Sequence, residues 1–126
     1  MKLMLLDWLE FHRDDEVLIC TQNGLFILNV KNDKIRTIDA VEKFNRYTRK
    51  INCAIKDRRG RIWIGTQNGL LLMQGNEVRR IAQDEGLSNT CIRSIVEDNY
   101  GNVWVGTSNG INRIYTEGKE LYVLPL

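Results

Sequence analysis

The chain has 126 residues, of which 43% are hydrophobic and 27% are charged, with a formal net charge of +2. This length suits a single domain, and the composition is that of a soluble globular protein, which excludes a disordered chain and a coiled coil. The nearly balanced charge gives no global attraction to nucleic acid or to a membrane surface, so no nucleic-acid partner is expected.

The amino terminus contains a short apolar run, Leu3-Met4-Leu5-Leu6, which Asp7 interrupts. The run is shorter than the ~7–15 apolar residues of a signal peptide. No other stretch approaches the ~20 apolar residues that cross a membrane. We therefore expect neither an export signal nor a membrane segment in this sequence.

An internal repeat organises the chain. Val17–Leu28, Ile62–Met73 and Val103–Ile114 align without gaps, and each contains a Thr-x-Asn-Gly motif, at spacings of 45 and 41 residues. The runs before this motif are short, rich in β-branched residues and bounded by turn residues, which is typical of strands. The Asn-Gly pairs predict hairpin turns, because both residues tolerate a positive φ.

A second pattern precedes two of these segments. Ile51–Gly60 matches Ile92–Gly101, and each ends in Asp-x-x-Gly. In such a turn the Asp carboxylate accepts backbone N–H groups and the Gly supplies the left-handed position. This shared place favours a turn role for Asp57 and Asp98 over a carboxylate pair for glycoside hydrolysis. In the first unit the pattern is degenerate, with Leu3–Phe11 as its expected counterpart.

A fourth β-like run follows each hairpin, at Lys34–Asp39, Val78–Ala82 and Leu121–Leu124. The sequence thus predicts an all-β protein of three four-stranded antiparallel repeats. Such repeats stack radially as blades of a β-propeller. We expect blade 1, which is degenerate, at about 1–40, blade 2 at about 51–83 and blade 3 at about 92–126. Three blades are fewer than the four to eight or so of a closed propeller, so the disc is expected to be open or completed by oligomerisation.

Two aromatic residues are expected to join the blades. Trp63 and Trp104 would pack between neighbouring blades, while Gly65 and Gly106 would allow the close approach of an adjacent strand. The first unit has Leu18 in place of Trp, which is typical of a terminal repeat.

The sequence shows no catalytic or metal-binding set. His12 is the only histidine and is expected in a solvated turn. Asp14–Glu16 is also expected in a solvated turn, because it lacks the spaced oxygen ligands of a calcium loop. The cysteines form no CxxC pair, so we expect neither a disulfide framework nor a zinc site, but three small buried side chains at Cys20, Cys53 and Cys91. No catalytic residue, metal or cofactor is predicted.

The basic residues are unevenly distributed. Residues 31–61 contain eleven Lys or Arg against four Asp or Glu. Within them, Phe44–Lys50 interleaves aromatic and cationic side chains, a pattern that suits anionic sugars or nucleic acid; a solvated connection between blades is the alternative. In a propeller this connection and the Thr-x-Asn-Gly turns would emerge on one face, where propellers commonly bind ligands. The predicted ligand-binding residues are therefore Arg46, Tyr47, Arg49, Gln67 and Ser108.

The repeated motif, Asp-x-x-Gly-x-Val/Ile-Trp-Ile/Val-Gly-Thr-x-Asn-Gly-Leu/Ile, resembles the two-component regulator propeller repeat, as does the lead-in Glu85–Ile92. The resemblance is strong over 51–115 and partial over 17–39. It implies a sensor module, from a family whose members carry arrays of such blades in the periplasm in front of a membrane span. The output in this family is a histidine kinase with a response regulator, or a diguanylate cyclase, and members from gut bacteria often respond to oligosaccharides.

The resemblance implies a non-catalytic sensory segment with an oligosaccharide as its expected ligand. It also implies a periplasmic location within a parent sensor, and only the rest of that sensor would contact the membrane. The expected partners are further blades or a second copy of the chain, two copies giving six blades. The alternative function is an interaction scaffold that associates through blade edges. An enzyme of propeller architecture is the third, least supported alternative.

Overall fold

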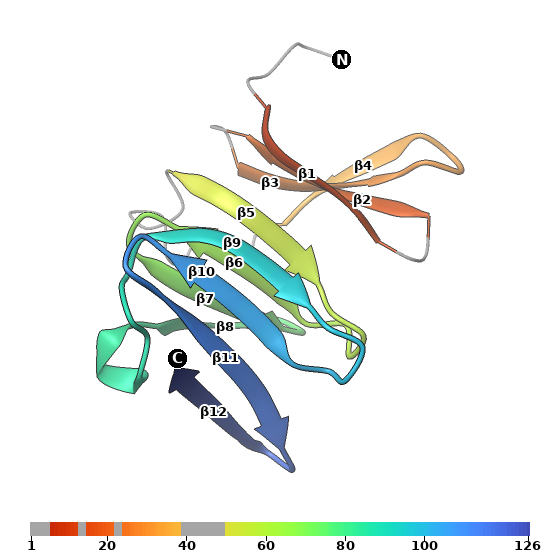
Figure 1. The fold of residues 1–126 in the computed structure, drawn as a ribbon. Coiled ribbons are helices and arrows are strands. Elements are labelled where there is room, and N and C mark those ends of the chain that lie inside the picture. The colour runs from red at the N-terminus through yellow and green to blue at the C-terminus, as the bar shows by residue number, and fades with distance from the viewer. Residues whose placement is uncertain (1–5, 13–14, 22–23, 39–49) are drawn as a thin grey trace.

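The computed structural model describes residues 6–12, 15–21, 24–38 and 50–126 (Figure 1). The described chain is built from three four-stranded antiparallel sheets, each a meander of consecutive strands, and contains almost no helix. The all-β prediction is therefore confirmed.

We call the sheets blades 1, 2 and 3. Blade 1 holds β1 (Leu6–His12), β2 (Glu16–Thr21), β3 (Gly24–Asn29) and β4 (Lys34–Thr37); blade 2 holds β5 (Ile51–Lys56), β6 (Ile62–Thr66), β7 (Gly69–Gln74) and β8 (Glu77–Ile81); blade 3 holds β9 (Ile92–Glu97), β10 (Val103–Thr107), β11 (Gly110–Glu117) and β12 (Glu120–Pro125).

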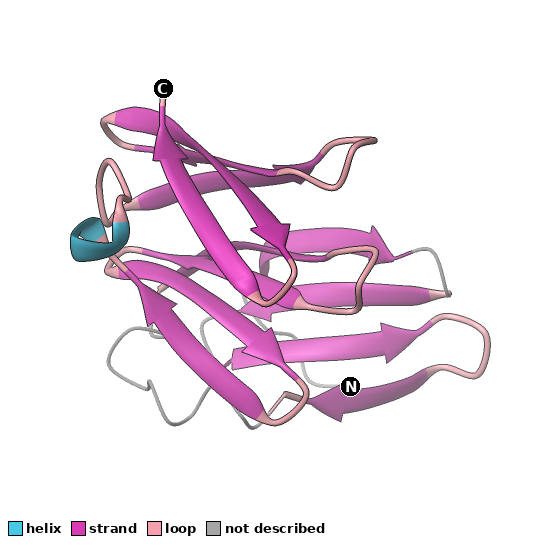
Figure 2. Cartoon of the chain, turned by 90° about the horizontal axis from the view of Figure 1, so that it is seen from below, coloured by secondary structure: helices cyan, strands magenta, loops and turns pink. Residues whose placement is uncertain are grey.

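The first strands of the three blades lie next to one another. β5 contacts β1 on one side and β9 on the other, so the outer edges of the blades are formed by β4, β8 and β12 (Figure 1). A 3₁₀ turn, Gln83–Glu85, interrupts the connection from β8 to β9 and lies at the margin of the sheets (Figure 2). This stacking of separate sheets, joined at their first strands, is the arrangement of propeller blades.

Blade 2 is covered on both faces. The alternation of side chains along its strands sends Ile64 and Leu71 into an apolar layer with Leu18 and Ile27 of blade 1. It sends Trp63 into a second layer, shared with blade 3. Every residue of β6 is therefore buried. The expected position of Trp63 between blades is confirmed.

The Asn-Gly turns differ from the prediction in one respect. Gly69 and Gly110 have positive φ angles of 126° and 116°, whereas Asn68 and Asn109 do not have positive φ. The Thr of the motif explains why: the Thr66 hydroxyl donates to the Gly69 carbonyl at 2.8 Å and accepts the Asn68 N–H at 3.0 Å. One Thr side chain thus holds the turn, and only the Gly adopts the unusual backbone conformation.

Three local expectations need correction. His12 ends strand β1 instead of lying in a turn, and Glu16 begins strand β2, where its carboxylate is only partly exposed and ion-paired. Cys91 is only partly buried, unlike Cys20 and Cys53. Its thiol contacts Gln67, with 3.1 Å between the Cys91 Sγ and the Gln67 Oε1, so a polar neighbour keeps it from the apolar core.

Candidate functional site

The Asp-x-x-Gly turns form a repeated polar cluster at one end of the blades, which we call the Asp-turn end. Asp57 Oδ1 accepts the backbone N–H groups of Arg59 and Arg61, each at 2.9 Å. Asp57 Oδ2 accepts the Trp63 indole N–H at 2.8 Å and the Arg61 Nε at 2.6 Å. The predicted capping by Asp is confirmed, and the structure adds the link from each Asp to its Trp.

Blade 3 repeats the cluster with one substitution. Asp98 Oδ1 accepts the N–H groups of Tyr100 and Asn102 at 2.8 and 2.9 Å, and its Oδ2 accepts the Trp104 indole N–H at 2.9 Å. These hydrogen bonds, led by that from Trp104, hold the pKa of Asp98 well below its ordinary value, although desolvation opposes them. Asn102 occupies the place of Arg61, so blade 3 has an amide where blade 2 has a cation.

Arg58 connects the two clusters. Its backbone N–H lies 3.2 Å from the Glu97 carboxylate oxygens, and its guanidinium donates to the carbonyl oxygens of Asn99 at 2.8 Å and Asp98 at 3.1 Å. These contacts of Arg58 fix the turn of blade 2 against the turn of blade 3. At the opposite end of β5, the Asn52 side chain donates to the Ile92 carbonyl at 2.7 Å and ties the start of β5 to the start of β9.

The opposite end of the blades carries the Thr-x-Asn-Gly turns. The segment before β9 joins two of them, because Gly69 donates its N–H to the Thr90 carbonyl at 2.7 Å and Ser108 donates its N–H to the Cys91 carbonyl at 3.0 Å. Gln67 contacts the Cys91 thiol, and the Arg93 Nε donates to the Ser108 hydroxyl at 3.0 Å. The structure thus brings two predicted site residues to one surface. The other three, Arg46, Tyr47 and Arg49, lie outside the described residues.

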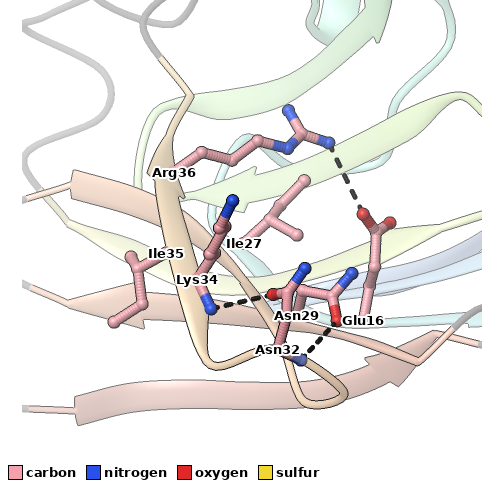
Figure 3. A pocket seen from close by; sticks show the side chains of 7 residues that line it. All are labelled: Glu16, Ile27, Asn29, Asn32, Lys34, Ile35 and Arg36. Carbon is pink, nitrogen blue, oxygen red and sulfur yellow. Dashed lines mark hydrogen bonds and ion pairs between the residues drawn. The ribbon is translucent and has the colours of Figure 1, made fainter.

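A cavity of about 310 Å³ lies on blade 1 at the Asp-turn end (Figure 3). The Glu16 carboxylate lies 3.8 Å from the Arg36 Nη2 and 3.3 Å from the Lys56 Nζ of blade 2. The Asn29 carboxamide oxygen accepts two N–H groups of the β3–β4 turn. Opposite charges and local hydrogen bonds therefore already satisfy much of this polar surface. The cavity is lined by Glu16, Ile27, Asn29, Asn32, Lys34, Ile35 and Arg36.

The face of blade 3 that points away from blade 2, which we call its outer face, carries aromatic side chains and is partly exposed. Tyr115 and Tyr122 stack with 5.0 Å between ring centroids, and the Arg113 guanidinium lies 5.4 Å from the Tyr115 centroid. Val96 and Tyr122 are 59% and 38% exposed. Trp104, expected between blades, is only partly buried on this face, whereas its counterpart Trp63 is 0% exposed.

The described part of the chain contains no group of three or more His, Cys, Asp or Glu residues placed to hold a metal ion. Among the same residues, no helix has the length and hydrophobicity needed to cross a membrane.

Stacked four-stranded meanders joined at their first strands define this chain as part of a β-propeller, and the comparison with known structures agrees. The profile of the two-component regulator propeller family matches residues 48–68 and 86–109. These matches contain the Asp-x-x-Gly turns and the Trp-x-Gly-Thr-x-Asn runs of blades 2 and 3, and the Gly that completes each Asn-Gly pair follows directly after the match. The chain therefore carries two-component regulator propeller repeats, as its motifs indicated.

Solved structures extend the likeness to the whole chain. The extracellular domain of BT3049, described as a hybrid two-component system of B. thetaiotaomicron, is 26% identical with a TM-score of 0.71, over 98% of this chain and 17% of that one. The extracellular domain of BT4673 from the same organism is 22% identical with a TM-score of 0.68, over 94% of this chain and 18% of that one. Virginiamycin B lyase from Staphylococcus aureus shares the fold, at 18% identity and a TM-score of 0.65, over 98% of this chain and 44% of that one.

This chain thus spans about one sixth of the length of the sensor domains that it resembles. It is similar to extracellular propeller domains of two-component systems. None of the curated proteins compared with the chain matches it.

Proposed function

We propose that this chain is a sensory, non-catalytic segment of a two-component sensor propeller, which binds an oligosaccharide or relays its binding. The observation that carries the proposal is the pair of in-register family repeats in blades 2 and 3, together with the likeness to extracellular sensor domains. The same likeness supports our proposal of a periplasmic location within a parent sensor.

The proposed ligand surface is the end of the blades that carries the Thr-x-Asn-Gly turns. Gln67 and Ser108 contribute amide and hydroxyl groups there, and Arg93 adds an exposed cation beside Ser108. Such groups provide the hydrogen bonds that fix a polar ligand in its orientation. Arg46, Tyr47 and Arg49, in the connection between blades 1 and 2, remain proposed contributors to this surface.

The test is a binding survey with xylo-, manno-, fructo- and pectin-derived oligosaccharides, followed by two-dimensional ¹H–¹⁵N NMR of the chain. We expect one oligosaccharide class to shift the backbone amides of Gln67 and Ser108 in a saturable way. A Gln67→Ala/Ser108→Ala variant should weaken that binding. Tyr100→Ala is the matched control, because Tyr100 is 91% exposed at the opposite end of blade 3. Shifts confined to the Tyr100 end would contradict the proposed surface.

The non-catalytic part of the proposal has its own test. The same oligosaccharides and their parent polysaccharides are incubated with the protein and analysed for shortened or unsaturated products. Turnover that disappears in an Asp57→Asn variant that still folds would show an enzyme and would overturn this part.

A second role, association through blades, is favoured by the open face of blade 3. The equivalent face of blade 2 is covered by blade 3, and the face of blade 3 presents Trp104, Tyr115 and Tyr122 without such a cover among the described residues. We propose that a second copy of the chain covers it in solution. Light scattering should then give at least twice 14.7 kDa. Val96→Asp should return the mass to that of the monomer, whereas a wild-type monomer at high concentration would contradict the proposal.

A further inference from the structure

A second cavity, of about 280 Å³, lies between blades 2 and 3 at the Asp-turn end. Blade 2 lines it with residues from the β5–β6 connection and from strands β7 and β8. Blade 3 contributes the end of β11, the β11–β12 turn and the start of β12. Four cationic side chains line the cavity, namely Arg59, Arg61, Arg79 and Lys119.

Two of these four cations have anionic partners. Arg61, 5% exposed, forms its ion pair with Asp57 and donates from Nη1 to the Thr116 hydroxyl at 2.6 Å. Arg79 pairs with Glu85. This network buries one guanidinium and ties it to the next blade, so it gives the cavity a fixed wall whose two cations are already paired with carboxylates.

The other two cations are unmatched. Arg59 and Lys119 are both exposed, and neither forms an ion pair with a residue in the described ranges. Glu117 and Glu120 flank Lys119 in the sequence, but neither lines the cavity. The cavity therefore carries two positive charges that no lining carboxylate neutralises.

The cavity on blade 1 occupies the equivalent place in the previous repeat, which gives a direct comparison. The ungapped repeat alignment places Glu16 at the position of Arg61, and Asn29 at the position of Gln74. The strand pairing is also equivalent: Arg36 is the cross-strand partner of Ile27 in blade 1, and Arg79 is the cross-strand partner of Leu72 in blade 2. In blade 1 the carboxylate of Glu16 lines the groove, lies close to Arg36 and Lys56, and offsets part of their charge. In blade 2 a cation takes its place, so no carboxylate lines the equivalent groove.

We propose that the cavity between blades 2 and 3 binds a small anion through a carboxylate or sulfate group. The guanidinium of Arg59 offers a planar pair of donors and Lys119 a point charge, both suited to an oxyanion. The Gln74 carboxamide lines the same space and can donate a further hydrogen bond, while Leu72 and Leu121 provide apolar contact for the body of an organic anion. The site lies at the end opposite Gln67 and Ser108, so it does not depend on the proposed oligosaccharide surface.

The test is a ¹H–¹⁵N NMR titration of the 126-residue chain with sodium sulfate, with sodium chloride lowered to keep the ionic strength constant. The indole N–H of Trp63 is the reporter, because it bonds to Asp57, which also holds Arg61. The indole of Trp104 is the internal control, since it sits in the same kind of turn without this cavity. We expect saturable shifts of Trp63, Gln74 and Lys119, with Trp104 unmoved.

Substitutions separate a site from general charge effects. Arg59→Ala and Lys119→Ala should each weaken sulfate binding about tenfold, as expected for loss of a hydrogen bond to a charged group. Both residues are exposed, and a dispersed NMR spectrum checks that each variant folds. Arg36→Ala, in the equivalent groove of blade 1, removes the same charge and should leave sulfate binding unchanged. Lys119→Glu should abolish it.

A second titration compares methyl β-glucuronide with methyl β-glucoside. A response to the glucuronide but not the glucoside upholds the site and assigns it to carboxylate-bearing sugars. A response to sulfate alone upholds it for inorganic anions. Shifts that rise linearly without saturation, that persist in Lys119→Glu, or that disappear equally in Arg36→Ala would overturn the proposal.

Discussion

Blades 2 and 3 carry the same motif in the same antiparallel register, and they differ in what covers them. Trp63 and Trp104 both donate their indole N–H to an Asp six residues earlier, at 2.8 and 2.9 Å. Trp63 is nevertheless 0% exposed under blade 3, whereas Trp104 lies on a face that is still partly open. The motif therefore fixes the geometry within a blade. How much each Trp contributes to the free energy of unfolding depends on whether a neighbouring blade covers it.

The sharpest test of this comparison is to truncate the two tryptophans. Trp63→Ala should lower the free energy of unfolding by about 3–5 kcal/mol, because it leaves a cavity in the layer shared by both blades. Trp104→Ala should cost clearly less, since solvent already reaches that side chain. Urea unfolding followed by circular dichroism measures both. Equal losses would show that the motif itself, without its neighbour, sets the stability.

Removing the two aspartates is the next test. Asp57→Ala should destabilise the fold by about 3 kcal/mol, because it leaves the buried guanidinium of Arg61 without its carboxylate. In blade 3 the position of Arg61 is occupied by Asn102, an uncharged amide, so Asp98→Ala should lower the free energy of unfolding by less. The same urea experiment applies. An Asp57→Ala/Arg61→Asn variant, which copies the blade 3 residue at 61, should recover part of the loss if the unpaired charge is its cause.

A smaller effect is expected at the glycines that follow the tryptophans. A Cβ at Gly65 would lie 2.5 Å from Ile92 Cγ2 and 2.7 Å from Cys53 Sγ, in a closed layer, so Gly65→Ala should cost about 1–3 kcal/mol. At Gly106 the close neighbour is the Ser94 hydroxyl, which can rotate away. Gly106→Ala should therefore lower the thermal midpoint less than Gly65→Ala, and the reverse order would contradict the packing.

The smallest effect concerns pH. The indole of Trp104, with other hydrogen bonds, lowers the pKa of Asp98 in the folded state from its ordinary value of 3.8. A lowered folded-state pKa adds stability above the ordinary value, and this contribution is lost as the pH falls toward the folded-state pKa. The thermal midpoints of the wild type and Asp98→Asn should thus differ at pH 7 and converge toward about pH 2. A constant difference across that range would contradict this account.

The repeat made the strands predictable. Thr-x-Asn-Gly and Asp-x-x-Gly are local signals, so Val103–Thr107 and its hairpin followed from the sequence alone. The bond from Asp to Trp was missed, although the Asp-x₅-Trp spacing occurs twice and could have shown it. The partial exposure of Trp104 could not be predicted, because it depends on a neighbour and not on the motif.

The sites were less predictable than the strands, for a related reason. Gln67 and Ser108 were placed on one surface by the meander topology, and their role in binding stays a prediction. The positive cavity could not be predicted from the sequence, because Lys119 and Arg59 line the same space only when the β11–β12 turn of blade 3 packs against blade 2. Glu16, expected in a turn, is the acidic partner of Arg36 and Lys56 at the equivalent groove of blade 1. Charge counted along the sequence does not show such pairings.

The contacts of Arg58 have a consequence for how the chain folds. They join residues 39 to 41 positions apart, and the Asn52–Ile92 bond has a separation of 40, which is one repeat. The entropy of closing a loop grows slowly with its length, so the same closure is repeated at nearly the same cost for each pair of blades. Blades 2 and 3 should therefore open and close as one cooperative unit, as in linear repeat arrays. Within these two blades, native-state hydrogen exchange should then be slowest in β6, which is buried throughout, and faster in the outer edge strands β8 and β12.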